Sequence, residues 1–156
     1  MNELEIIKSE VDTLLEKLAV EASAQVTQKD EFFQVAIQME GADASSTEAG
    51  ILIGYHGETL SALQLILSLI ISKKLGRFVR LIVNVGDYRE KREEKLKEMA
   101  LEAARRAKET KQEVILGNLS PWQRRIIHIA LADDSDIQTE SQGEEPDRQL
   151  IIKPRK

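Results

Sequence analysis

The sequence predicts an α+β fold that is built from two small consecutive modules. Three observations support this prediction: apolar residues recur at helical spacing over 3–19, apolar and polar residues alternate over 32–39, and a second series of helical and extended patterns follows residue 87. The chain has 156 residues, of which 42% are hydrophobic and 31% are charged, so it can bury one core or two small ones. Residues 1–86 and 87–156 are the predicted domains.

The first module is predicted to have the element order α-β-β-α-α-β, with a three-stranded sheet and helices on one side of it. Lys29-Asp30 forms the turn of a hairpin, Ser46 is a candidate N-cap for the short helix, and Gly76 ends the long one. The elements are helix 3–19, strands 22–27 and 32–39, a short helix ending near residue 53, helix 58–74 and strand 78–85.

The second module begins at Asp87, which is the expected N-cap of a long helix. Ser120-Pro121 gives a second helix an N-cap and a proline at its first position. The expected elements are helix 87–111, strand 112–116, helix 122–133 and the strands 137–141 and 149–152 around a turn at 143–146. The inward face of the long helix is expected to contain Leu96, Met99, Ala100, Ala103 and Ala107.

The helix over 58–74 is more apolar than a surface helix requires. Its polar stripe is narrow, and apolar side chains from Leu60 to Ile71 occupy roughly two-thirds of its circumference, whereas a surface helix usually shows a stripe of about 100°. One part of this arc is expected to pack on the sheet. The excess indicates a partner surface, or cover by the second domain.

The charge distribution leaves two interpretations open. The net charge is −5, yet residues 71–111 contain thirteen Lys and Arg against seven Asp and Glu. Such a segment can steer a polyanion through its local field, or it can be a solvated helix with many ion pairs. The sequence alone does not choose between them.

The composition excludes several classes of protein. The chain has no cysteine, so disulfides and thiolate chemistry are excluded. The acidic start lacks the form of a signal peptide, and the apolar run 60–71 is too short to span a bilayer, so a cytoplasmic protein is expected. His56 and His128 lie in different modules, and no catalytic or metal-ligand pattern stands out, so neither an enzyme nor a cofactor is expected.

The motif that points to a function is Gly54-Tyr55-His56-Gly57, directly before the helix that starts at residue 58. Glycine has no Cβ, so the backbone can approach a phosphate closely, and the N–H groups of the following helix point at it. This is how a GxxG loop clamps a nucleic-acid backbone. The alternative is a tight turn between two helices.

The order α-β-β-α-GxxG-α-β resembles a type II KH domain. Asp87-Tyr88-Arg89, Arg92, Leu96, the segment 121–128 and the tail 139–148 resemble an R-three-H domain, a small α/β module with an Arg-x-x-x-His signature that here is Arg124 and His128. A KH domain followed by an R-three-H domain resembles the bacterial Jag family, the sporulation-associated or cell-elongation RNA-binding proteins connected with cell shape. The resemblance covers nearly the whole chain.

The resemblance implies binding of single-stranded RNA, or single-stranded DNA, in a groove beside the GxxG loop. It also implies a second nucleic-acid surface on the R-three-H module, and a homodimer or a heterodimer with a small KH protein through the 60–71 helix. Two departures stand out. Tyr55 occupies a position that is usually basic in this family, and the chain starts at the KH helix, without the N-terminal Jag domain of many members.

The expected RNA-binding residues are therefore the four loop residues together with four residues of the second module. Arg124 and His128 share one face of a helix and can contact phosphate or a base, or they can pair with the acidic segment 133–145. Trp122 is expected to be a packing anchor. The competing function is a protein-interaction module of the same fold with a weakened RNA surface. The RNA-binding set is Gly54, Tyr55, His56, Gly57, Arg89, Arg92, Arg124 and His128.

Overall fold

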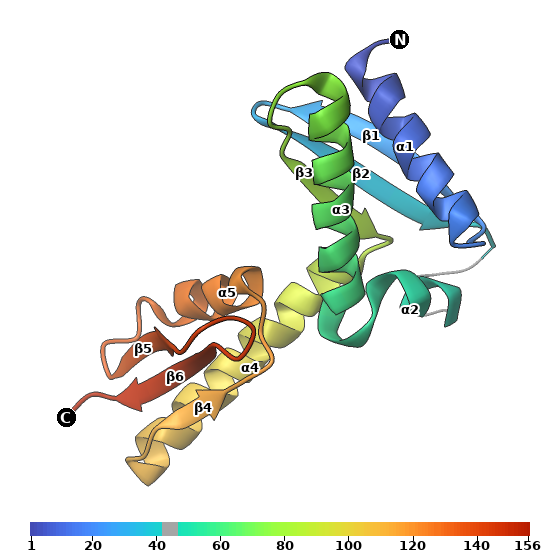
Figure 1. Cartoon of the computed structure of the whole chain (residues 1–156). Helices are drawn as coiled ribbons and strands as arrows, with labels where there is room; N and C mark the ends of the chain where they lie inside the picture. Colours follow the sequence, from blue (N-terminus) through green and yellow to red (C-terminus); the bar gives the residue numbers. More distant parts are fainter. Residues whose placement is uncertain (42–46) are drawn as a thin grey trace. The chain divides into compact units, whose positions relative to one another are not determined.

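The computed structural model describes residues 1–41 and 47–156 (Figure 1). It divides into two compact units, Met1–Arg89 and Glu90–Lys156, which are called unit 1 and unit 2 below. The division falls three residues after the expected one at Gly86. The N-cap expected at Ser46 lies outside the described residues.

Unit 1 has the predicted order of elements. They are α1 (Glu3–Lys17), β1 (Ala22–Lys29), β2 (Phe32–Met39), α2 (Thr47–Ile53), the 3-10 turn η1 (Tyr55–Gly57), α3 (Glu58–Leu75) and β3 (Leu81–Val85). A capping box that the sequence analysis did not identify starts α1, because the Asn2 side chain accepts from the Glu5 amide and the Glu5 carboxylate accepts from the Asn2 amide, both at 2.9 Å. Gly76 ends α3 in the left-handed conformation, as predicted.

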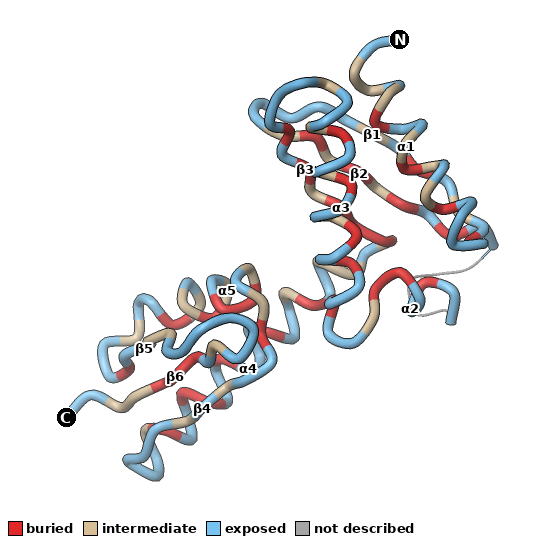
Figure 2. Tube along the Cα trace, viewed as in Figure 1, coloured by how far each residue is buried: buried red, intermediate tan, exposed pale blue. Residues whose placement is uncertain are grey.

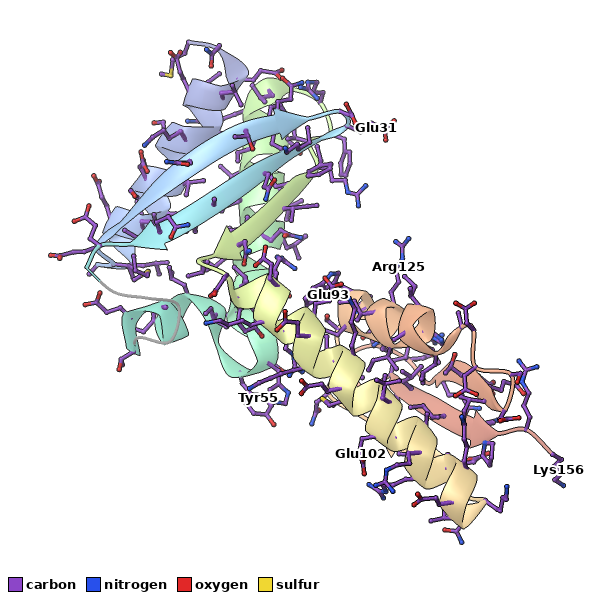
Figure 3. All side chains as sticks on the ribbon, turned by 180° about the vertical axis from the view of Figure 1, so that it is seen from behind. Glu31, Tyr55, Glu93, Glu102, Arg125 and Lys156 are labelled. Atoms are coloured by element: carbon purple, nitrogen blue, oxygen red, sulfur yellow. The ribbon has the colours of Figure 1, made fainter. Side chains whose placement is uncertain are left out.

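The sheet of unit 1 has the order β1-β2-β3, with β1 and β2 antiparallel and β2 and β3 parallel. The alternation in β2 is confirmed, since Phe33, Val35, Ile37 and Met39 are all buried. They pack with apolar residues of α1 and α3, and both helices lie on the same face of the sheet (Figures 1 and 3). Within the described part of unit 1, no helix lies on the opposite face.

Unit 2 contains α4 (Tyr88–Thr110, which begins within unit 1), β4 (Val114–Leu116), α5 (Pro121–Leu131), β5 (Ile137–Gln142) and β6 (Gln149–Pro154). Its antiparallel sheet has the order β4-β6-β5. The predicted cap of α5 is confirmed: Ser120 and Gln123 form a capping box, and Pro121 is the first helical residue. The α+β fold predicted from the sequence is therefore correct for both units.

The core of unit 2 lies between its sheet and the inward faces of α4 and α5 (Figure 2). Leu96, Ala100, Ala103 and Ala107 form the buried stripe of α4. Met99 was wrongly assigned to this stripe. It is 37% exposed, because it falls at the edge of a stripe that the small alanines keep narrow. Trp122 packs against the core from α5, as expected.

Two strands begin later than predicted, for the same physical reason. The amide of Val79 donates to Ser72 Oγ at 2.9 Å instead of to a strand, so β3 starts at Leu81 and not at residue 78. The amide of Gln112 donates to Thr110 Oγ1 at 3.3 Å, and β4 starts at Val114. In the part of the chain that the structure describes, no helix has both the length and the apolar character that crossing a membrane requires.

Candidate nucleic-acid interface

The loop before α3 has a backbone that requires glycine at both glycine positions of the GxxG motif. Gly54 has φ +71° and ψ −174°, and a Cβ there would lie 2.1 Å from Thr59 Oγ1 and 2.9 Å from the Thr59 amide nitrogen. Gly57 has φ +83°, and its Cβ would lie 2.9 Å from the hydroxyl oxygen of Tyr88. The backbone is thus folded tightly onto the start of α3, which leaves the outer side of both glycines without a side chain.

The start of α3 adds the features that favour an anion. Its N-cap is Gly57, which has no side chain to satisfy the first amides of this 18-residue helix. At the loop tip Tyr55 is 64% exposed, and its ring stacks on that of His56 with centroids 4.0 Å apart and planes inclined by 16° (Figure 3 labels Tyr55). Glu58 in the first turn brings an opposing negative charge. The loop therefore offers backbone donors and an aromatic surface, with little fixed positive charge.

Arg89 lies in unit 1 and stabilises the outer edge of β3. Its Nε donates to the Val83 carbonyl at 2.7 Å, and its Nη2 donates to Gln64 Oε1 at 2.8 Å. Gln64 in turn accepts from the Val83 amide at 2.9 Å. Both strand-edge groups of Val83 are thus taken by side chains, which protects the free edge of the sheet.

Arg92 belongs to unit 2 and is nine-tenths buried. Among the described residues, its Nε and Nη2 have no hydrogen-bond partner. Both donor atoms are buried, so leaving them without acceptors costs free energy and no ligand can reach them in this conformation.

Arg124 and His128 lie on one side of α5, as their spacing predicts, and both make contacts within unit 2. Arg124 is only 5% exposed; its Nη1 donates to the Leu119 carbonyl at 2.7 Å, and its Nη2 forms an ion pair with Glu145. His128 Nδ1 lies 2.6 Å from Thr139 Oγ1 and its Nε2 lies 3.1 Å from Ser141 Oγ, both on β5. The ion pair of Arg124 with Glu145 corresponds to the alternative of pairing with the acidic segment 133–145, whereas the partners of His128 are two hydroxyl groups of that segment.

The protonation of His128 follows from this environment. Burial, and then the nearby positive charge of Arg124, lower the pKa of the His128 imidazole below its ordinary value. The ring is therefore neutral at pH 7. Its two nitrogens act as one donor and one acceptor towards the two hydroxyl groups.

Much of the basic segment 71–111 is engaged in ion pairs. Among the described residues, at least five of its thirteen basic residues pair with carboxylates: Lys74 with Glu10, Arg77 with Glu3, Lys97 with Glu93, Arg105 with Glu102 and Glu109, and Lys108 with Asp134. For these five residues the structure matches the ion-paired alternative. Arg125, in contrast, is exposed on α5 and points away from the body of unit 2 (Figure 3).

The described residues contain no group of three or more His, Cys, Asp or Glu side chains that could hold a metal ion. The candidate interface therefore consists of the GxxG loop in unit 1 and the Arg124–His128 side of α5 in unit 2. The residues that the sequence analysis did not identify here are Gln64, Thr139, Ser141 and Glu145, which hold the expected ones in place.

Comparison with known proteins identifies both units. Residues 8–83 match the KH domain of the KhpA/KhpB family, and residues 94–154 match the R-three-H domain. The chain is 37% identical over 135 residues to the RNA-binding protein KhpB of Clostridium symbiosum, which covers 86% of this chain and 58% of that protein.

Two further relatives carry the same name. The identity is 34% over 111 residues to RNA-binding protein KhpB of Lactiplantibacillus plantarum, covering 71% of this chain and 34% of the relative. It is 27% over 150 residues to RNA-binding protein KhpB of Streptococcus pneumoniae serotype 2, covering 96% and 45%. The chain thus spans between about a third and three-fifths of the length of these relatives.

Proposed function

We propose that this chain, which belongs to the KhpB (Jag) family of proteins with a KH domain followed by an R-three-H domain, binds single-stranded RNA and acts by binding alone. The family membership supports RNA as the ligand. The observation that carries the proposal for this chain is the geometry of Gly54 and Gly57, whose positive φ angles and lack of room for a Cβ leave bare backbone at the start of α3.

In this proposal the loop clamps the RNA backbone. A phosphate approaches Gly54 and Gly57 from the side without side chains and accepts from the first amides of α3. Tyr55 and His56 supply a stacked aromatic surface for a neighbouring base or a hydrogen bond to phosphate. Because Tyr55 has no charge, this contact depends on hydrogen bonds and stacking more than on ion pairing.

The second contact is proposed on the Arg124–His128 side of α5. Glu145 occupies the guanidinium of Arg124 in the way a phosphate oxygen would, so RNA must displace Glu145 to reach it. Arg92 also has two donors without a hydrogen-bond partner in the described chain, but both atoms are buried, so its side chain must move before RNA can reach them. Arg89 acts indirectly, by holding the edge of β3 beside α3.

The test is binding of a labelled single-stranded RNA pool at low and moderate salt. The variant Tyr55→Asp/His56→Asp places two negative charges where the phosphate is expected and keeps both glycines. Aspartate tolerates the left-handed backbone of His56, which has φ +51°. The matched control is Ser9→Asp/Thr13→Asp, which adds the same charge to exposed positions of α1.

The wild type is expected to bind with an affinity that falls with salt, by a slope of about 0.7 per phosphate contact. The loop variant, still folded by circular dichroism, should lose most of this binding, and the α1 control should keep it. If both variants lost RNA binding equally, the loss would be due to net charge, and clamping of RNA by the GxxG loop would be excluded. Absence of salt-sensitive binding by the wild type would exclude RNA as the ligand of this chain.

A second candidate function is pairing with another KH domain through α3. Four of its apolar residues, Leu60, Leu63, Leu67 and Ile71, are buried in unit 1, and four others remain exposed: Leu65, Ile66, Leu69 and Ile70. The exposed four lie at i, i+1, i+4 and i+5 and form one continuous stripe. The partner proposed is a second copy of this chain or a small KH protein of the KhpA type.

This pairing is tested by measuring the mass of the chain in solution by light scattering, alone and mixed with a single-KH protein. Leu65→Lys/Leu69→Lys should abolish any dimer, because it would place two charges in an apolar contact. Leu101→Lys, at an equally exposed position of α4, is the control. A wild type that is monomeric alone and in the mixture at micromolar concentration would rule out α3 as a pairing surface.

A further inference from the structure

One face of the unit 1 sheet is left uncovered by the described helices of that unit. The core side chains of β2 point towards α1 and α3, so the alternate residues point the other way. Figure 3 shows this second face, with β1 and β2 in front of the two helices. Its exposed positions are not part of the GxxG loop or of the apolar stripe of α3.

The side chains on this open face are neutral or basic. The register pairs the outward residues across the two strands as Ser23 with Gln38, Gln25 with Ala36, Thr27 with Gln34 and Lys29 with Phe32. On β3 the outward residue Ile82 is half-buried, whereas Asn84 is only 6% exposed and its Oδ1 accepts from the amides of Val85 and Arg89, so the open face ends at Ile82. None of these positions carries a carboxylate, although the whole chain has 27 acidic residues against 22 basic ones. The amide and hydroxyl groups can both donate and accept hydrogen bonds.

One end of the face combines aromatic rings with a cation. The guanidinium of Arg80 lies over the ring of Phe32, 5.9 Å from its centroid. The amide of Phe33 donates to the Arg80 carbonyl at 2.9 Å, which fixes residue 80 beside the start of β2. Phe78 is 82% exposed, and Val79 between it and Arg80 is buried, so Phe78 and Arg80 both point away from the core.

We propose that this face, ending in Phe32, Arg80 and Phe78, is a second surface for single-stranded RNA, on which unpaired bases stack. The inference rests on the proposed function, because it takes RNA to be the ligand of the chain. Stacking on exposed rings is how sheet surfaces bind bases in other RNA-binding folds, and an arginine beside the rings adds a cation for the phosphate. The glutamine side chains of the strands provide donors and acceptors for base edges.

The charges at this end show which interaction dominates. Lys29 and Arg80 are opposed by Asp30 and Glu31 in the hairpin turn, so the local charge is close to balanced. Attraction of phosphate is therefore small, and stacking supplies most of the affinity. RNA is favoured over a protein partner because an exposed ring beside an arginine, with amide and hydroxyl groups along the strands, is the combination that binds unpaired bases.

The aromatic end of the open face is distant from the GxxG loop. The loop lies at the start of α3 and Phe78 follows its end, and an 18-residue helix is about 27 Å long. The two surfaces therefore contact different nucleotides. Mutations in one are expected to leave contacts at the other intact, so their effects on affinity can be measured separately.

The experiment uses the full chain and a labelled single-stranded RNA pool, measured by fluorescence anisotropy over a range of salt. Phe78→Leu removes the ring but keeps an apolar side chain, and Phe78→Tyr keeps the ring. Loss of stacking on one base weakens binding by about 5- to 150-fold. We expect a loss in this range for Phe78→Leu, with the salt slope unchanged, and near wild-type binding for Phe78→Tyr.

Two further variants complete the test. Arg80→Gln should weaken RNA binding and reduce the salt slope by at most about 0.7, the value for one phosphate contact. Lys17→Gln removes the same charge at an exposed position of α1 and is the control. RNA containing 4-thiouridine should also crosslink to the segment 78–80 on irradiation. All variants are checked by thermal unfolding, which should be unaffected because Phe78 and Arg80 are exposed.

The outcomes separate this inference from the proposed function. If Tyr55→Asp/His56→Asp loses RNA and Phe78→Leu binds like the wild type, the open face is not an RNA surface and the clamp stands. If Phe78→Leu loses RNA and the loop variant does not, the open face stands and the clamp fails. If Phe78→Leu and Phe78→Tyr are equally weak, or no crosslink forms at 78–80, stacking on this ring is excluded.

Discussion

Replacing Gly54 with alanine tests the central geometric argument, that the loop backbone approaches α3 too closely for any side chain. Gly54 has φ +71° and ψ −174°, a region that is nearly restricted to glycine and that costs other residues about 1–3 kcal/mol. The new Cβ would also lie 2.1 Å from Thr59 Oγ1 and 2.9 Å from the Thr59 amide nitrogen. The hydroxyl can rotate away, but the amide is fixed by α3.

The expected magnitude follows from these two terms. Overpacking against fixed atoms costs about 1–3 kcal/mol, so Gly54→Ala should lower the free energy of unfolding of unit 1 by roughly 2–6 kcal/mol. Gly76→Ala is the matched control. Gly76 has a similar φ of +66°, but no atom of the described residues lies within 4 Å of its Cβ position, so only the left-handed cost of about 1–2 kcal/mol applies.

Urea unfolding followed by circular dichroism measures both variants. Trp122 is the single tryptophan and lies in unit 2, so its fluorescence reports on the unfolding of that unit. An unfolding transition that circular dichroism detects and Trp122 fluorescence does not belongs to unit 1. Gly54→Ala should shift that transition further than Gly76→Ala and should also weaken RNA binding. If the two variants are equally stable, or Gly54→Ala binds RNA like the wild type, the close approach is not required.

Three further predictions concern unit 2. Because burial and Arg124 lower the pKa of His128, the folded state favours the neutral ring. The contribution of His128 to the stability of unit 2 should therefore be complete above pH 6.5 and should decline as the pH falls below that value. Urea unfolding followed by Trp122 fluorescence measures this dependence, and His128→Gln should flatten it. Glu145→Gln removes the carboxylate that competes for Arg124, so RNA binding at low salt should strengthen; unchanged or weaker binding would mean that Arg124 only holds the hairpin. Ser120→Ala breaks the capping box of α5 and should cost about 1 kcal/mol, whereas a cost near zero would mean that the cap does not stabilise the helix.

The sequence predicted the fold correctly wherever a pattern lay within a single helix or strand. The periodicity of α1 and α5, the alternation in β2 and the glycine at the end of α3 all specify local structure, and the structure agrees with each. The starts of β3 and β4 were misplaced because hydroxyl groups of Ser72 and Thr110 take amides that the strand pattern assigned to a sheet. Competition of this kind depends on tertiary contacts and leaves no periodic signal.

In the candidate site, too, local features could be predicted from the sequence and tertiary contacts could not. Gly54 and Gly57 could be identified from sequence because few other residues accept their backbone geometry. For Arg124 the sequence offers the acidic segment 133–145 as an alternative partner but does not single out Glu145, which is 21 residues away in a turn whose position is set by the hairpin of β5 and β6. Arg89 is predicted from the sequence to bind RNA, whereas Gln64, 25 residues before it, and the Val83 carbonyl occupy two of its donor groups.

The ion pairs bear on how an acidic protein of net charge −5 can bind a polyanion. Long-range attraction requires unpaired positive charge, and five basic residues of the 71–111 segment are already paired with carboxylates. The proposed RNA contacts are of other kinds: backbone amides in the first turn of α3, the stacked rings of Tyr55 and His56, and the exposed ring of Phe78. Such contacts release few counterions. The logarithm of the binding constant should therefore fall with the logarithm of the salt concentration by the slope that one to three phosphate contacts give, which is well below the slope of a strongly basic RNA-binding protein. A salt slope of that size, together with loss of affinity when the aromatic rings are removed, is expected if RNA is bound by hydrogen bonds and stacking rather than by long-range electrostatic attraction.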